Sequence, residues 1–282
     1  MHENGYAHPH RLVPTTWVAA HTGDPHVRLV EVDVDTTAYD TGHIPGAVGW
    51  DWRVDLQRHP VRDIPDQAEW QALLSRSGIG ADDLVVLYGD NHNWFAAFAY
   101  WLFTLYGHAD VCLMDGGRVK WVAEGRELTT ETSTVIPTTY AAQQPNYALR
   151  AVRDEVAAAL GRPGVALVDV RSPKEYSGEL LAPENMPQEG AQRGGHIPGA
   201  QNVPWATAVA EDGTFKPANE LRAIYGGKGV TPETATIAYC RIGERSAHTW
   251  FVLKELLGHP DVRNYDGSWT EWGSLIGAPI AR

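Results

Sequence analysis

Short apolar runs alternate with amphipathic stretches along the whole chain. The runs at 29–33, 84–88, 166–169 and 236–239 are rich in Val, Leu and Ile and are typical of buried strands. Between them, apolar residues recur three or four positions apart, which predicts helices packed through one face over 67–75, 93–106, 150–160 and 245–257. Strands that alternate with helices predict an α/β fold built on parallel sheets.

The pattern occurs twice. The hexapeptide Gly-His-Ile-Pro-Gly-Ala at 42–47 returns unchanged at 195–200. The strand-like run ending at Asp90 corresponds to the run ending at Cys240, and 114–117 corresponds to 265–268. These matches keep one order at an offset of roughly 150 residues, so the chain is interpreted as two copies of one domain. We predict domains over 11–128 and 148–282, joined by a linker over 129–147 that lacks periodicity.

The second copy contains an additional segment. It lies around Ser177 to Arg193, is rich in Pro, Glu, Gln and Gly, and is expected to form a surface loop of unknown role.

Composition and charge narrow the classes of protein. The chain has a formal net charge of −12, with 43% apolar and 21% charged residues, which is typical of a globular protein. The negative charge argues against a nucleic-acid partner or an anionic membrane. We expect neither a membrane-spanning helix nor a secretory signal, because no apolar run is long enough for the first and the polar start at 1–11 does not fit the second. Two cysteines are too few for a disulfide framework, and this favours a cytoplasmic location.

Of the two cysteines, Cys240 has the sequence context of a nucleophile. It ends a strand and is followed by Arg241, Ile242, Gly243 and Glu244 before a helix that is expected to begin near Arg245 and Ser246. Loop amides, the positive helix end and two arginines favour a thiolate, so we expect a lowered thiol pKa and a site suited to an anionic persulfide. Cys112 lies inside an apolar strand and is expected to be structural.

The segment Cys-Arg-Ile-Gly-Glu-Arg at 240–245, both hexapeptides, Asp-Val-Arg at 169–171 and Asp-Gly-Ser-Trp at 266–269 together resemble the rhodanese family. The resemblance covers nearly the whole chain and is nearest to tandem-domain thiosulfate sulfurtransferases of bacterial type. It implies two rhodanese-like domains, each a mainly parallel sheet flanked by helices. The first is expected to be inactive because Asp90 occupies the cysteine position.

By this resemblance, Cys240 attacks the outer sulfur of thiosulfate and then passes that sulfur from its persulfide to cyanide or a thiol. The expected substrate-binding residues are Arg171, Arg241 and Arg245, with a loop around the sulfur formed by Ile242, Gly243, Glu244 and Ser246. No metal or organic cofactor is implied. The physiological acceptor and the oligomeric state stay open.

The sequence departs from the family pattern at two positions. Ile242 occupies a position where many thiosulfate-specific relatives have lysine, and Glu175 occupies one where such relatives tend to carry arginine. These changes keep 3-mercaptopyruvate open as an alternative donor, although Arg241 and Ile242 differ from the small loop residues of that group. A phosphatase of the Cys-loop-Arg type and a non-catalytic binding module are further alternatives. The loop from Cys240 to Arg245 is shorter than in the phosphatases, which favours a single sulfur atom over a phosphoryl group.

Several other polar residues are interpreted as structural. His43 and His196 recur in both copies, including the one without a cysteine, and Asp169 is expected to hold Arg171 or its loop. Trp94 and Phe95 are expected to pack between the domains, or else to line the active-site cleft.

Overall fold

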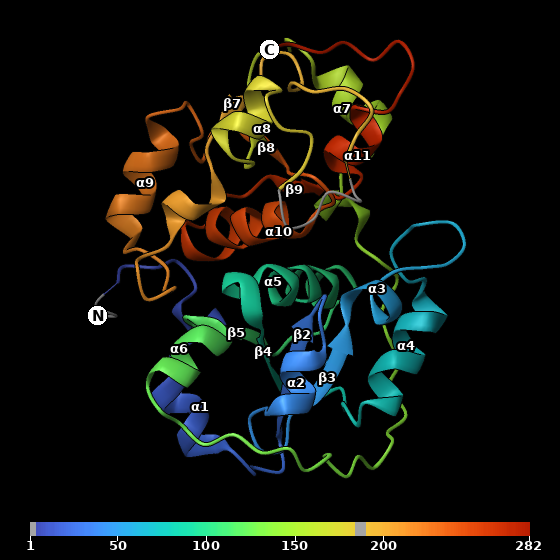
Figure 1. Cartoon of the computed structure of the whole chain (residues 1–282), viewed down its shortest axis with the longest axis vertical. Helices are drawn as coiled ribbons and strands as arrows, with labels where there is room; N and C mark the ends of the chain where they lie inside the picture. Colours follow the sequence, from blue (N-terminus) through green and yellow to red (C-terminus); the bar gives the residue numbers. More distant parts are fainter. Residues whose placement is uncertain (1–3, 184–189) are drawn as a thin grey trace. The chain divides into compact units, whose positions relative to one another are not determined.

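A computed structural model describes residues 4–183 and 190–282, so part of the predicted surface loop at 177–193 lies outside the described residues. The chain divides into two units (Figure 1). The N-terminal unit contains His10–Asn146 and the short segment Glu211–Thr214. The C-terminal unit contains Tyr147–Ala210 and Phe215–Arg282, together with the start of the chain up to Pro9. No helix in the described ranges is both long and apolar enough to cross a membrane.

The N-terminal unit is a five-stranded sheet of order β1-β5-β4-β2-β3, and all its strand pairs are parallel. Its strands are β1 (Leu12–Val13), β2 (Val27–Asp33), β3 (Val48–Asp51), β4 (Leu84–Tyr88) and β5 (Val111–Met114). Its helices are α1 (Thr15–His21), α2 (Thr37–Thr41), α3 (Trp52–Asp55), α4 (Gln67–Arg76), α5 (Asp90–Leu105) and α6 (Gly117–Ala123). Helix α5 packs on β2, β4 and β5 because nearly all its side chains from Trp94 onwards are apolar.

The C-terminal unit is a four-stranded parallel sheet of order β7-β6-β8-β9. Its strands are β6 (Val165–Asp169), β7 (Gln201–Asn202), β8 (Ala235–Tyr239) and β9 (Val262–Tyr265). Its α-helices are α7 (Arg153–Ala159), α8 (Pro173–Ser177), α9 (Ala218–Gly226), α10 (Glu244–Phe251) and α11 (Ser268–Trp272). Helix α10 continues into a π-helical turn, Val252–Leu256, and packs on β8 and β9.

The two sheets repeat one topology. Strands β3, β2, β4 and β5 follow the same spatial order as β7, β6, β8 and β9. Even the edge position of β1 has a counterpart, since Arg150 makes a parallel bridge to Asn264 of β9. The duplicated sequence therefore folds as two α/β domains with parallel sheets, as the repeat predicted.

The four helices expected from periodicity are present with shifted ends. Helix α10 begins at Glu244, one residue earlier than predicted. Helix α5 is assigned from Asp90, but Asn91–Asn93 have left-handed backbone angles, so its regular part begins after Asn93, close to the predicted start. The aperiodic segment 129–146 is held against the N-terminal unit by backbone hydrogen bonds. Thr138 N–H donates to Ser75 O at 3.0 Å and Asn146 N–H donates to Leu105 O at 2.8 Å.

Candidate active site

Cys240 follows the last residue of β8 and precedes the first turn of α10. The turn between them requires Gly243, which has a left-handed φ of 106°. A Cβ at this position would come within 2.9 Å of the Asp266 Cα, so side chains are excluded for reasons of space as well. The carboxyl end of a parallel strand and the amino end of a helix thus meet at the thiol, where α/β proteins commonly place their sites.

The Cys240 sulfur lies among polar groups of its own loop. Gly243 N–H donates to Sγ at 3.1 Å, and the Ser246 hydroxyl lies 3.7 Å from Sγ. The thiol itself donates to Glu244 Oε2 at 3.2 Å. Cys240 has no exposed surface, so a donor reaches Sγ only when the residues covering it move.

The electrostatics of the thiol differ from the sequence-based prediction. Burial raises the pKa of Cys240, and the facing carboxylate of Glu244 raises it further, while Arg245 and Ser246 lower it by less. The lowered thiol pKa predicted from the flanking arginines is therefore wrong for this state of the site. The arginines are present, but carboxylates already compensate their charges.

Arg245 extends from α10 to Glu175 of α8. Its Nη1 and Nη2 donate to the two carboxylate oxygens of Glu175 at 2.9 and 3.0 Å, and both side chains are buried. Burial alone would raise the pKa of Glu175, but the hydrogen bonds and charge of Arg245 lower it to about 2. Glu175, which stands where the resemblance led us to expect an arginine, is thus the ion-pair partner of Arg245.

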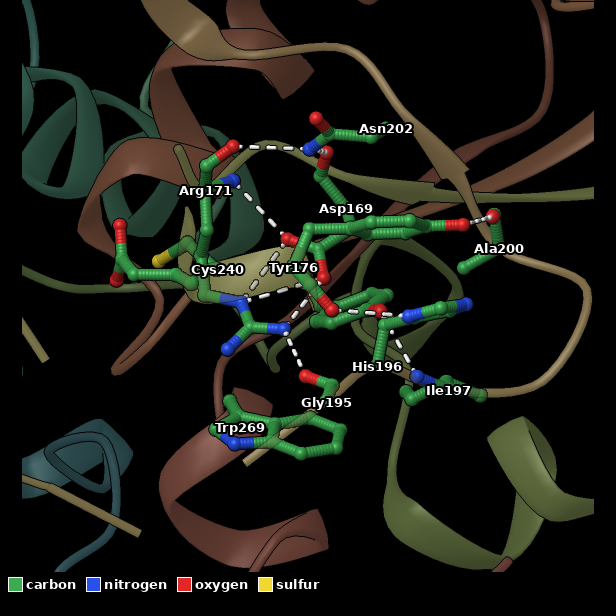
Figure 2. A network of polar contacts seen from close by, with 12 residues as sticks. Asp169, Arg171, Tyr176, Gly195, His196, Ile197, Ala200, Asn202, Cys240 and Trp269 are labelled. Atoms are coloured by element: carbon green, nitrogen blue, oxygen red, sulfur yellow. Dashed lines mark hydrogen bonds and ion pairs between the residues drawn. The ribbon is translucent and has the colours of Figure 1, made fainter. Parts of the chain in front are cut away.

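Arg171 is held by its own strand end. Asp169 accepts from Arg171 Nε at 3.0 Å and from Nη2 at 2.6 Å, and Nη2 also donates to Gly195 O at 2.7 Å (Figure 2). The Trp269 ring lies 4.5 Å from the guanidinium carbon. Asp169 therefore positions Arg171, which confirms the structural interpretation of this aspartate. The Nη1 group of Arg171 is buried and has no hydrogen-bond partner in the described part of the chain.

Arg171 and Cys240 leave neighbouring strands at the same end of the sheet. Asp169 of β6 pairs with Tyr239 of β8, and Val170 N–H donates to Tyr239 O at 3.0 Å. The remaining predicted residues, Arg241, Ile242, Gly243, Glu244 and Ser246, lie in the loop or the first turn of α10 and are buried. The structure brings all the candidate residues to this edge.

Two residues that sequence reasoning did not assign to the site support the loop. Ser268 Oγ accepts the Cys240 N–H at 3.0 Å, and Asn264 Oδ1 accepts the Ser246 hydroxyl at 2.6 Å. The match between 114–117 and 265–268 in the internal repeat was the signal that could have identified Ser268.

The equivalent position of the N-terminal unit has different chemistry. Asp90 replaces the cysteine, and Asn91, His92 and Asn93 all have left-handed backbone angles. The buried cation here is Arg118 of α6, which donates to Glu31 at 3.1 Å and to Gly42 O, the counterpart of Gly195 O. Burial raises the pKa of Asp33 to about 8, and the nearby Asp90 and Glu31 add to the effect.

The structural interpretation of the repeated histidines agrees with their contacts. His43 Nδ1 lies 2.8 Å from Tyr39 O, and His196 Nδ1 lies 2.9 Å from Tyr176 O; each ring stacks on the tyrosine that it contacts. Cys112 is fully buried in the core, and burial raises its pKa to about 12. Phe95 packs against Trp52 within the N-terminal unit, at 5.3 Å between ring centroids.

The family model for the rhodanese-like domain matches residues 14–124 and 152–275. The chain belongs to the rhodanese family. Among related rhodanese sequences, a protein of Saccharopolyspora erythraea named "Putative thiosulfate sulfurtransferase" is 59% identical over 95% of both chains. The "Sulfur carrier protein TtuD" of Thermus thermophilus is 56% identical over 99% of both chains.

A solved structure also resembles the chain over most of its length. It is a variant of EanB, described as a complex with ergothioneine covalently linked to a cysteine persulfide. It aligns with a TM-score of 0.83 at 26% identity and covers 96% of this chain and 69% of its own.

Proposed function

We propose that this rhodanese takes the outer sulfur of thiosulfate and carries it on Cys240 as a persulfide. The observation that supports this most directly is the position of Sγ, which accepts the Gly243 N–H at 3.1 Å at the start of α10. Peptide N–H groups and a helix amino end stabilise an anionic sulfur without a metal or organic cofactor. The names of the thiosulfate sulfurtransferase and sulfur carrier relatives agree with this chemistry.

The reaction has two half-reactions. A lone pair of the Cys240 thiolate attacks the outer sulfur of thiosulfate, the S–S bond of the donor breaks, and its electrons leave with sulfite. A nucleophilic acceptor then attacks the terminal sulfur and restores Cys240. The acceptor that we propose is a thiol, since a relative of 56% identity is named as a sulfur carrier, and cyanide acts as a convenient substitute in an assay.

Arg171 is the proposed anchor for the sulfonate group of the donor. Its Nη1 group points to no acceptor among the described residues, whereas Asp169 fixes the rest of the guanidinium. Arg241 and Arg245 are the other proposed substrate-binding residues, and both lie beside Glu244 Oε1, at 3.7 and 3.5 Å. The N-terminal domain, 11–128, is proposed to be non-catalytic because it presents Asp90 in place of the nucleophile.

A phosphatase reaction fits this geometry less well. The loop from Cys240 to Arg245 is shorter than in phosphatases of the Cys-loop-Arg type, which leaves less room for the three equatorial oxygens of a phosphoryl group. A 3-mercaptopyruvate donor remains an alternative that the same experiment distinguishes.

The test is the intact mass of the protein after incubation with thiosulfate or with 3-mercaptopyruvate. The wild type should gain the mass of one sulfur atom from thiosulfate and lose it on adding cyanide. Cys240→Ala should gain none, while Cys112→Ala should behave like the wild type. Faster gain of sulfur from 3-mercaptopyruvate would identify that compound as the preferred donor. Gain of sulfur by Cys240→Ala would disprove the assignment of Cys240 as the sulfur carrier.

A further inference from the structure

A buried carboxylate lies in contact with the reacting sulfur. The Cys240 thiol donates to Glu244 Oε2 at 3.2 Å, and Glu244 has no exposed surface. The other carboxylate oxygen, Oε1, is buried without a hydrogen-bond partner in the described part of the chain. Buried carboxylates are normally satisfied by several donors, so an incompletely bonded one beside a nucleophile requires an explanation.

The other acidic groups around the loop are firmly paired. Asp169 binds Arg171 at 2.6 Å and Glu175 binds Arg245 at 2.9 Å. Asp266, which packs against Gly243, binds Arg150 at 2.8 Å.

Glu244 has only longer ion-pair contacts. Its Oε1 lies 3.7 Å from Arg241 Nη2 and 3.5 Å from Arg245 Nε. Each arginine around the loop thus faces a carboxylate, and the charges of the site balance while the thiol keeps its proton. An anionic persulfide would add one negative charge directly beside Glu244, which is unfavourable in a buried site.

We propose that Glu244 takes the proton of Cys240 when the loop receives sulfur and returns it when the sulfur leaves. This inference rests on the proposed sulfurtransferase function and assigns its acid–base group. Thiol, carboxylate and thiosulfate become persulfide anion, carboxylic acid and sulfite, so one proton moves from Sγ to Oε2 and the number of charges in the loop is unchanged. The acceptor step reverses the transfer: the acceptor takes the terminal sulfur, and the released Sγ recovers the proton from Glu244.

The other neighbours of the sulfur do not fit this role. The Ser246 hydroxyl is directed to Asn264 Oδ1 at 2.6 Å, Gly243 offers only its N–H, and guanidinium groups do not accept protons at neutral pH. The raised pKa of the Cys240 thiol agrees with a resting state in which sulfur keeps the proton.

The decisive variant is Glu244→Gln, which keeps the size and polarity of the side chain but cannot accept a proton. In this variant the rate at which Cys240 gains sulfur from thiosulfate, measured by intact mass in a single-turnover experiment, should be about a hundredfold lower at neutral pH. Its rate should then rise with pH, because the thiol must lose its proton to solvent. The wild-type rate should change little across neutral pH. The matched control is Glu255→Gln, a buried glutamate of the same unit that is paired with His8 at 2.9 Å.

Infrared difference spectra provide a readout that a structural role would not affect. Adding thiosulfate to the wild type and to Glu255→Gln should produce the C=O band of a protonated carboxylic acid, and Glu244→Gln should lack it. This wild-type measurement holds even if the variant folds poorly. Absence of the band in a wild type that has gained sulfur would overturn the inference alone, as would a Glu244→Gln profile of wild-type shape. A wild type that gains no sulfur would instead disprove the proposed function.

Discussion

Glu175 Oε1 and Oε2 each accept one hydrogen bond from Arg245, at 3.0 and 2.9 Å, in a fully buried pair that joins α8 to α10. The two hydrogen bonds fix the orientation of the Arg245 guanidinium, and Glu175 balances its charge. Burial and the facing carboxylate of Glu244 raise the pKa of the Cys240 thiol, and Arg245 lowers it by less, so the thiol does not gain the low pKa that two neighbouring arginines predicted.

Removing one partner of this pair should destabilise the C-terminal unit. We expect Glu175→Gln to cost about 3–5 kcal/mol, because it leaves a buried guanidinium uncompensated. The pKa of Glu175 is lowered from 4.5 to about 2, so its contribution is present above pH 4.5 and is lost as pH falls toward 2. Denaturant unfolding of the variant across this pH range tests both, with the exposed Glu220→Gln as control. Equal stability of the two variants would show that the pair contributes nothing.

The role of Arg171 as sulfonate anchor predicts a donor-dependent defect. Arg171→Lys keeps the charge but loses the planar fork, so we expect KM for thiosulfate to rise by about tenfold or more. Loading from a polysulfide, which has no sulfonate group, should suffer much less. The ratio of the two loading rates is the measurement, because general damage to the site would reduce both equally.

Introducing a cysteine into the N-terminal unit should not make that unit accept sulfur from thiosulfate. Asp90→Cys would place a thiol before three residues with left-handed backbone, Asn91–Asn93, in a loop that contains no arginine of its own. Arg118 lies 3.9 Å from the Asp90 carboxylate but is already bound to Glu31. We expect this variant to gain one sulfur atom from thiosulfate, as the wild type does. A gain of two, or any gain by Asp90→Cys combined with Cys240→Ala, would show that the fold alone activates a cysteine at this turn.

Asp33 should make the stability of the N-terminal unit depend on pH. Its pKa rises from 3.8 to about 8 because it is buried near Asp90 and Glu31. Between these values the unfolded chain has lost the proton that the folded chain retains, so stability should fall as pH rises, by up to about 1.4 kcal/mol per pH unit.

The variant that tests this is Asp33→Asn, which imitates the protonated side chain. Thermal unfolding between pH 5 and pH 9 should show a flatter profile for Asp33→Asn, while the exposed Asp35→Asn should retain the wild-type slope. Parallel slopes for all three proteins would assign the pH dependence to other groups.

The architecture was accessible from the sequence because its signals are local. Apolar runs, the spacing of apolar residues in helices and the repeated hexapeptide depend on neighbours along the chain, and they predicted two parallel α/β domains. The position of Cys240 at a strand-to-helix turn followed in the same way, because Gly243 marks the turn that the backbone must make. A residue such as Ser268 was missed, since its contact with the Cys240 N–H joins segments that the sequence keeps apart.

The electrostatic state of the site depended on the folded arrangement. From their positions in the sequence, Arg241 and Arg245 were expected to surround the cysteine with positive charge, and Glu175 was interpreted as a reversed charge. In space Glu175 neutralises Arg245, and Glu244 turns toward the sulfur instead of toward solvent. The energy of a buried charge depends on distance and exclusion of water, and both are properties of the packed structure rather than of the order of residues.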